Sequence, residues 1–148
     1  MKREQGGEGM QISQFVESQT DAVIALWTRC GLVRSWNDPR LDIARKQTDK
    51  NGCFLVGHSA DALIASVMVG YDGHRGSINY LSFDADFARH GYGALLMREA
   101  EDFLFSIGCL KINLCVRADN AAVIDFYNSV DYQVENVHLF GKRLIKDE

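Results

Sequence analysis

Two glycines, Gly91 and Gly93, stand between a strand-like segment and the start of an amphipathic helix, where backbone amides can do chemistry. The first turn of a helix leaves N–H groups without intrahelical partners, and the helix dipole places a partial positive charge behind them. An anion, most often a phosphate, binds well at such a turn, and glycine lets it come close because glycine has no Cβ atom. The two glycines alone are equally compatible with a tight strand-to-helix turn.

Two common nucleotide-binding signatures do not fit this stretch. The dinucleotide fingerprint needs a third glycine where Leu96 stands, and an acidic residue at the end of the next strand. The phosphate loop of nucleoside triphosphatases needs a Gly-Lys-Ser or Gly-Lys-Thr, which does not follow here. No metal site is expected either, because the four histidines lack the spacing of a ligand pair on one helix.

The composition is that of an ordinary globular domain. The chain has 148 residues, of which 47% are hydrophobic and 24% charged, enough for one domain with a substantial core. The net charge of −4 argues against a nucleic-acid partner, and no apolar run has the length of a membrane span. The four cysteines form no Cys-x-x-Cys pair, so we expect reduced thiols and a cytoplasmic protein.

Hydrophobic periodicity and turn residues predict seven strands and four helices. Strands are expected at residues 10–15, 53–57, 63–69, 77–83, 111–116, 132–137 and 138–145. Helices are expected at residues 20–30, 38–50, 91–107 and 121–130. The central strand–helix–strand unit requires a parallel crossover, whereas the hairpins before it are antiparallel. The prediction is a single α+β domain with a mixed sheet over residues 10–148, preceded by a disordered tail over residues 1–9.

This order of elements resembles the GCN5-related N-acetyltransferase (GNAT) family over nearly the whole chain. The family's acetyl-CoA signature, Gln/Arg-x-x-Gly-x-Gly/Ala, corresponds to residues 88–93. Its second signature, an Asn followed seven residues later by a Tyr, corresponds to Asn120 and Tyr127. Ala88 departs from the family's Gln or Arg, so one side-chain contact to the pyrophosphate should be missing, and Asp131 stands where the family has Gly.

The resemblance implies acetyl-CoA as cosubstrate, no metal, and a set of residues around the cofactor. Residues 81–83 would hold the pantetheine arm, with a bulge that splays this strand from the next, and residues 89–94 would cradle the pyrophosphate. Tyr127 would be the general acid for the leaving thiolate, although its spacing also fits a core aromatic, and Asn120 also fits a plain helix cap. The implied cofactor-binding residues are Leu81, Ser82, Phe83, Arg89, His90, Gly91, Tyr92, Gly93, Ala94, Asn120 and Tyr127.

The sequence says less about the part of the site that would bind the acceptor amine. The residues expected near the amine are Trp36, Asn37, Asp38, Tyr71, Asp72 and His74. Trp36 could equally pack beneath the second helix. The general base stays open between a water chain and the side chains of Asp72, His74, Asp84 and Asp86.

The predicted function is transfer of the acetyl group of acetyl-CoA to a primary amine, of a small molecule or a peptide, by direct attack in a ternary complex. The alternative is a non-catalytic CoA-binding module that regulates a partner, which Ala88 motivates. A purely structural domain is the third hypothesis. The expected partners are acetyl-CoA and an amine, with no nucleic acid and no membrane, and a homodimer is compatible with the sequence.

Overall fold

The computed structural model describes residues 9–87 and 90–147, and these form an α+β fold around one mixed sheet. The sheet contains β1 (Gln11–Gln14), β2 (Cys53–Ser59), β3 (Ala62–Tyr71), β4 (Gly76–Phe83) and β5 (Ile112–Leu114), side by side in this order. Neighbouring strands are antiparallel except β4 and β5, which are parallel. The helices are α1 (Thr20–Arg29), α2 (Pro39–Gln47), α3 (Tyr92–Ser106) and α4 (Ala121–Ser129).

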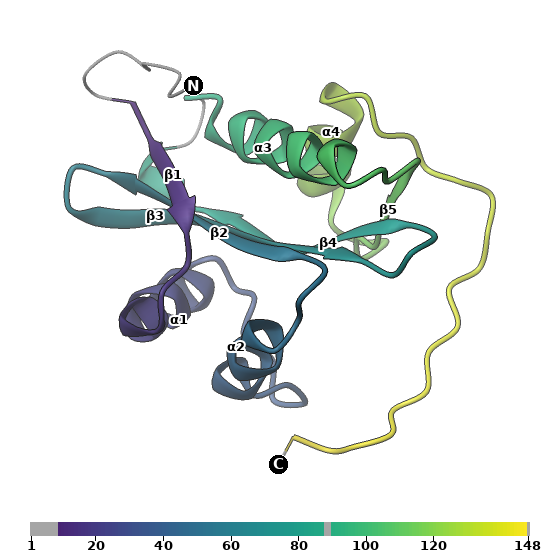
Figure 1. The fold of residues 1–148 in the computed structure, drawn as a ribbon, viewed down its shortest axis with the longest axis horizontal. Helices are drawn as coiled ribbons and strands as arrows, with labels where there is room; N and C mark the ends of the chain where they lie inside the picture. Colours follow the sequence, from purple (N-terminus) through teal and green to yellow (C-terminus); the bar gives the residue numbers. More distant parts are fainter. Residues whose placement is uncertain (1–8, 88–89, 148) are drawn as a thin grey trace.

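The helices cover both faces of the sheet, two on each (Figure 1). Against α1 and α2 the sheet buries a cluster that includes Trp27, Ile43 and Phe54. Against α3 and α4 it buries a second cluster that includes Leu96 and Tyr127. The strand β3 is almost continuously apolar because both of its faces are covered, as expected for a central strand.

The predicted helix starts are confirmed at two caps. Asp38 Oδ1 accepts hydrogen bonds from the backbone N–H groups of Arg40, at 2.9 Å, and Leu41, at 3.4 Å, ahead of Pro39 in the first turn of α2. Asn120 Oδ1 accepts a hydrogen bond from the backbone N–H of Val123 at 3.3 Å, at the start of α4. Within the described residues, every helix is too short or too polar to span a bilayer.

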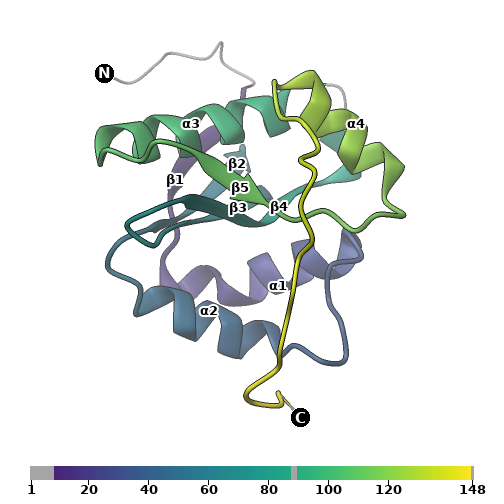
Figure 2. The same ribbon diagram turned by 90° about the vertical axis from the view of Figure 1, so that its right-hand side faces the viewer.

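The prediction of seven strands is wrong for the single chain, which has five in its described part. Residues 132–145, where the sequence predicts two strands, contain none. They run as an extended segment from the α3–α4 layer, past the β5 edge of the sheet, to α2 (Figures 1 and 2). A strand needs a neighbour to pair with, and an alternating pattern does not reveal whether one is within reach. The expected N-terminal tail falls mostly on residues 1–8, outside the described residues.

Candidate active site

The strand β4 is irregular in its second half. Ser82 pairs with Ser66 and Asn79 pairs with Met68, so two residues of β4 lie opposite one residue of β3. This is a β-bulge, and in it Tyr80 has a φ of 53°, a left-handed conformation that few non-glycine residues adopt. The sequence does not reveal this position, because Tyr is an ordinary strand residue.

The parallel pair of strands opens directly after its first residues. β5 pairs with β4 only from Gly76 to Ile78, so residues 79–83 run on without a β5 partner. The backbone groups on that side of residues 79–83 are therefore available to a ligand. The splay that the resemblance implies between residues 77–83 and 111–116 is present.

A buried hydrogen-bond network from α1 fixes the bulge. The indole Nε1–H of Trp27 donates to Ser66 Oγ at 2.8 Å, and the Ser66 hydroxyl donates to the carbonyl oxygen of Tyr80 at 3.0 Å. The Ser82 hydroxyl lies 2.8 Å from Ser66 Oγ and completes the set. The Trp27 ring also stacks on Tyr80, with ring centroids 3.9 Å apart. One fully buried serine thus holds both the bulged backbone and the helix that covers it.

Tyr80 also ties the bulge to α2. Its hydroxyl donates to Asp42 Oδ2 at 2.6 Å, and Asp42 accepts from Arg45 at 2.9 Å. Burial and the neighbouring carboxylate both raise the pKa of the Tyr80 phenol, so it stays protonated over the physiological range.

Glycine is favoured at the two positions of the loop for different structural reasons. Gly91 is the N-cap of α3 with a φ of 75°, and its carbonyl accepts the helix bond from the Leu95 N–H at 3.1 Å. A Cβ atom at Gly91 would meet nothing within 4 Å among the described residues, so the left-handed φ and not crowding favours glycine there. A Cβ atom at Gly93 would lie 2.9 Å from the Phe126 ring and 3.2 Å from the Phe83 ring. Gly93 is therefore needed for the packing of α3 against α4 and β4.

The loop and the second signature lie at the same edge of the sheet. The helices α3 and α4 each follow one strand of the parallel pair, β4 and β5, and ligands bind open sheets at the carboxyl ends of such strands. His90 is exposed, with its ring 5.3 Å from that of Tyr92, and the expected contact residue Arg89 lies outside the described residues. Asn120 is the cap of α4, and its contact with a cofactor stays a prediction.

Tyr127 is a core aromatic, as its spacing allows, and its role as general acid stays a prediction. Its ring is 8% exposed and packs edge-on against Phe126 and Tyr132, at centroid distances of 5.1 and 5.5 Å. Among the described residues its hydroxyl has no hydrogen-bond partner, and its oxygen atom is not completely buried. Burial raises the pKa of this phenol to about 12.

The six residues expected near the amine occupy two separate places. Tyr71 is the last residue of β3, and Asp72 and His74 follow in the β3–β4 turn, so all three precede β4, whereas the glycine loop follows it. The eight residues of β4 separate the two ends by about 25 Å. Asp72 Oδ1 accepts from the N–H groups of His74 and Arg75, both at 2.7 Å, and these bonds lower its pKa. The carboxylate thus stabilises its own turn.

The other three residues lie ahead of α2, in the opposite helix layer. Trp36 is 48% exposed, so it does not pack beneath the helix as a core residue would. Asn37 Oδ1 accepts from Arg143 at 3.3 Å, and the Asp38 backbone N–H donates to Asp147 Oδ2 at 3.2 Å. The C-terminal residues therefore border this part of the surface.

The end of β4 has partners that the sequence does not indicate. The Cys30 thiol, at the end of α1, donates to the Phe83 carbonyl oxygen at an Sγ–O distance of 3.4 Å, and burial raises its pKa. Asp84, one of the candidate bases, forms an ion pair with Arg29 at 3.1 Å. Asp86 is exposed. Among the described residues there is no cluster of three His, Cys, Asp or Glu side chains that could hold a metal.

Comparisons with known proteins agree with this geometry. The acetyltransferase (GNAT) family model matches residues 12–132. An acetyltransferase of Yersinia enterocolitica is 45% identical over 139 residues, which cover 94% of this chain and 99% of that protein. An acetyltransferase of Pectobacterium atrosepticum is 45% identical over 138 residues, which cover 93% and 98%. The chain therefore belongs to the GNAT acetyltransferase family.

A solved structure shares the fold at low sequence identity. The aminoglycoside N-acetyltransferase AAC(6')-Iy in complex with CoA aligns with a TM-score of 0.77 at 14% identity, covering 95% of this chain and 99% of that one. With the family established, the predicted enzyme class, an acetyltransferase that uses acetyl-CoA, is confirmed.

Proposed function

We propose that this chain transfers the acetyl group of acetyl-CoA to a primary amine by direct attack in a ternary complex. The observation that carries the proposal is the opening between β4 and β5 after Ile78, at the edge of the sheet where α3 begins. That opening offers an unpaired strand edge to the acyl arm beside a helix start for the pyrophosphate.

The backbone at the start of α3 would bind the pyrophosphate. The helix has 15 residues, and its first turn carries no acidic side chain. The helix dipole and the first-turn N–H groups favour an anion at this end. Because Ala88 stands at the first signature position, residues 90–94 would supply the binding through their backbone.

The second half of β4 would hold the pantetheine arm. The unpaired edge of Leu81–Phe83 can form strand-like backbone hydrogen bonds with the amides of the arm, and a backbone N–H near Phe83 would stabilise the oxyanion. The Ser82 hydroxyl is already bonded to Ser66, so the contact would be made by the main chain.

Tyr127 would donate the proton to the leaving thiolate. The phenol is protonated at neutral pH, which is the state a general acid needs, and its hydroxyl has no hydrogen-bond partner among the described residues. Its pKa of about 12 exceeds that of a free thiol, about 8.5, so full proton transfer would be uphill before catalysis begins. Charge developing on sulfur in the transition state would drive the transfer.

The acceptor is proposed as a primary amine of a small molecule or a peptide. Asp38 and Asp72, which could attract a cationic amine, both accept backbone hydrogen bonds in this fold, so neither is devoted to a substrate. Of the candidate bases, Asp84 is committed to Arg29, which favours proton removal through water. We also place the enzyme in the cytoplasm, because its four cysteines are free thiols.

A thiol-release assay with acetyl-CoA over a panel of amines tests the proposal. The panel should include aminoglycosides, amino sugars, polyamines and peptides with free N-terminal or lysine amines. Release of CoA that depends on one amine class supports the proposal. Calorimetric titration with acetyl-CoA separates the alternative functions. Binding without transfer to any amine supports the regulatory CoA-binding module. No binding at millimolar acetyl-CoA contradicts both the enzyme and the CoA-binding module.

A further inference from the structure

The bulge turns the Tyr80 side chain to the face of the sheet opposite α3. In a regular strand, residues 78 and 80 point to the same face. Ile78 packs in the cluster against α3 and α4, whereas Tyr80 packs against the cluster that α1 and α2 cover. The extra residue of the bulge, with the left-handed φ of 53° at Tyr80, accounts for the change of face. Such a backbone is strained for a tyrosine, and strain of this kind concentrates at functional sites.

The phenol of Tyr80 is oriented from two helices. Its hydroxyl donates to Asp42 Oδ2 at 2.6 Å, and Asp42 Oδ1 in turn accepts from Arg45 at 2.9 Å. The Trp27 ring stacks on the Tyr80 ring with an angle of 10° between their planes. Because the phenol proton is directed to Asp42, the phenol oxygen has only lone pairs for a third group, and that group must be a hydrogen-bond donor. Among the described residues no donor bonds to this oxygen.

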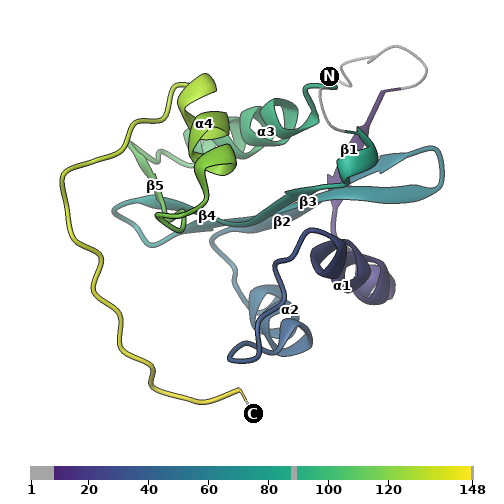
Figure 3. The same cartoon turned by 180° about the vertical axis from the view of Figure 1, so that it is seen from behind.

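The Tyr80–Asp42 pair stands where the sheet opens. β4 has no β5 partner after Ile78, so Tyr80 is the second residue of the unpaired stretch. Tyr80 is only partly buried, and the Asp42 side chain is 22% exposed, so the pair borders solvent. The helices α1 and α2 lie on this face of the sheet, whereas α3, whose start would hold the pyrophosphate, lies on the other face (Figures 1 and 3). An acceptor that approaches from the α1–α2 face therefore meets the acetyl group without displacing the cofactor.

We propose that the Tyr80 phenol oxygen accepts a hydrogen bond from the acceptor amine, and that Asp42 is the positioning residue that orients the phenol for this contact. The inference rests on the proposed acetyl transfer and assigns to it a residue that touches the acceptor. A primary amine arrives from water as an ammonium ion, which carries only N–H donors. It therefore matches an oxygen that can only accept.

Tyr80 keeps its own proton throughout the transfer. Burial and the neighbouring Asp42 carboxylate raise the pKa of its phenol, so Tyr80 is not the base. The ammonium ion first loses one proton to water, and the neutral nitrogen then attacks the thioester carbon. The C–N bond forms, the C–S bond breaks, and the nitrogen releases a second proton to water, while the thiolate takes a proton from Tyr127, which regains one from water. By holding one N–H group, Tyr80 orients the nitrogen and takes no net proton.

Steady-state kinetics of Tyr80→Phe tests the contact, because this variant keeps the stacked ring and removes only the hydroxyl. The probe amines are kanamycin, glucosamine, spermidine and trialanine, and the one with the highest wild-type turnover is used. We expect the KM for that amine to rise at least about tenfold, which is the effect of losing one hydrogen bond to a charged donor. The dissociation constant for acetyl-CoA, measured by calorimetry, should stay within about twofold, because the phenol does not touch the cofactor.

Two substitutions at Asp42 test the positioning role. Asp42→Ala removes the acceptor that orients the phenol and should raise the KM for the amine. Asp42→Asn should keep a KM close to that of the wild type, because the amide oxygen can still accept from Tyr80. The effects of Asp42→Ala and Tyr80→Phe should not add in the double variant, since Asp42 acts through the phenol.

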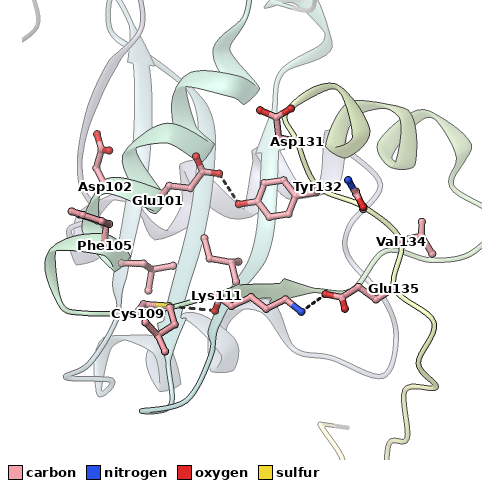
Figure 4. A pocket seen from close by; sticks show the side chains of 13 residues that line it. Glu101, Asp102, Phe105, Cys109, Lys111, Asp131, Tyr132, Val134 and Glu135 are labelled. Carbon is pink, nitrogen blue, oxygen red and sulfur yellow. Dashed lines mark hydrogen bonds and ion pairs between the residues drawn. The ribbon is translucent and has the colours of Figure 1, made fainter.

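Two controls separate this contact from a general loosening of the fold. Tyr132→Phe breaks a similar bond, from its hydroxyl to Glu101 Oε2 at 2.7 Å, beside α3 (Figure 4), and should leave the KM for the amine unchanged. Ser66→Ala loosens the bulge at the Tyr80 carbonyl but leaves the phenol in place, so it should lower kcat more than it raises the KM for the amine.

The outcomes that overturn the proposal are distinct. An unchanged KM for the amine in Tyr80→Phe overturns the contact. An acetyl-CoA affinity that falls as much as the KM for the amine rises also overturns it, because the phenol would then shape the cofactor site. If Asp42→Asn behaves like Asp42→Ala, Asp42 does not act by orienting the phenol. A wild type that transfers acetyl to none of the four probes refutes the proposed function and the contact together, whereas transfer with an unchanged KM in Tyr80→Phe refutes the contact alone.

Discussion

The substitution Tyr127→Phe removes one oxygen atom and separates the two proposed roles of this residue, core packing and proton donation. The ring fills a place in the core between Phe126 and Tyr132, and Tyr127→Phe leaves that ring in position. The hydroxyl has no hydrogen-bond partner among the described residues, so its loss breaks no bond within the protein. We therefore expect the free energy of unfolding to change by less than about 1 kcal/mol.

The same substitution should lower the rate of catalysis much more than it lowers stability. A positioned general acid contributes typically a factor of 10² to 10⁴ to the rate. We expect kcat of Tyr127→Phe to fall at least about 100-fold, which corresponds to about 2.7 kcal/mol of transition-state stabilisation. The dissociation constant for acetyl-CoA should change less than about tenfold, because at most one ordinary hydrogen bond to the cofactor is lost.

Three measurements decide the prediction. Thiol release gives kcat, calorimetric titration gives the acetyl-CoA affinity, and thermal denaturation gives stability. The matched control is Tyr132→Phe, which removes the hydrogen bond to Glu101 at 2.7 Å from a neighbouring ring and should lower stability but not kcat. If Tyr127→Phe keeps its kcat, or if affinity collapses while turnover of the bound enzyme persists, Tyr127 is a structural aromatic and the proton comes from elsewhere.

Three further predictions concern packing, the bulge and alkaline pH. Gly93→Ala should lower stability by up to about 2 kcal/mol in thermal denaturation, because crowding against Phe126 at 2.9 Å outweighs the helix propensity gained; a rise in stability would contradict this. Ser66→Ala should cost about 1–3 kcal/mol in denaturant unfolding, because it leaves the Trp27 indole N–H without its acceptor; Ser106→Ala, on the surface, is the control. The raised pKa of Tyr127 contributes stability that is complete below the unfolded pKa, about 10, and is lost as pH rises towards about 12, by at most about 3 kcal/mol. Tyr127→Phe should flatten that part of the stability profile.

The sequence predicts those features whose causes are local. The cap at Asp38 ahead of Pro39, the cap at Asn120 and the glycine at the start of α3 each depend on a few adjacent residues, and all three are present. The hairpin of β2 and β3 is likewise found, with both strands longer than predicted. Periodicity and turn chemistry suffice for such features because their partners lie within a few residues along the chain.

The features that the sequence does not predict depend on partners distant in the chain. The bulge at Tyr80 is held through Ser66 by Trp27, and no pattern links these three positions. The six residues expected near the amine fall into two places, the segment ahead of α2 and the β3–β4 turn, and that turn lies at the opposite end of β4 from the glycine loop. Residues 132–145 have a strand pattern, but they pair with no strand in the described part of the chain.

The bulge links α1 and α2, the two helices of one layer, to the strand edge on which transfer would depend. At Tyr80 the backbone is fixed from α1 through Ser66, and the phenol is fixed from α2 through Asp42. The next residues, Leu81–Phe83, have no β5 partner, and the Phe83 ring lies close to Gly93 in the first turn of α3. A change in α1 or α2 can therefore move the strand edge without touching the glycine loop. Substitutions at Ser66 or Asp42 should accordingly alter acetyl transfer more than the binding of CoA itself, since in the proposed function CoA is held largely at the helix start.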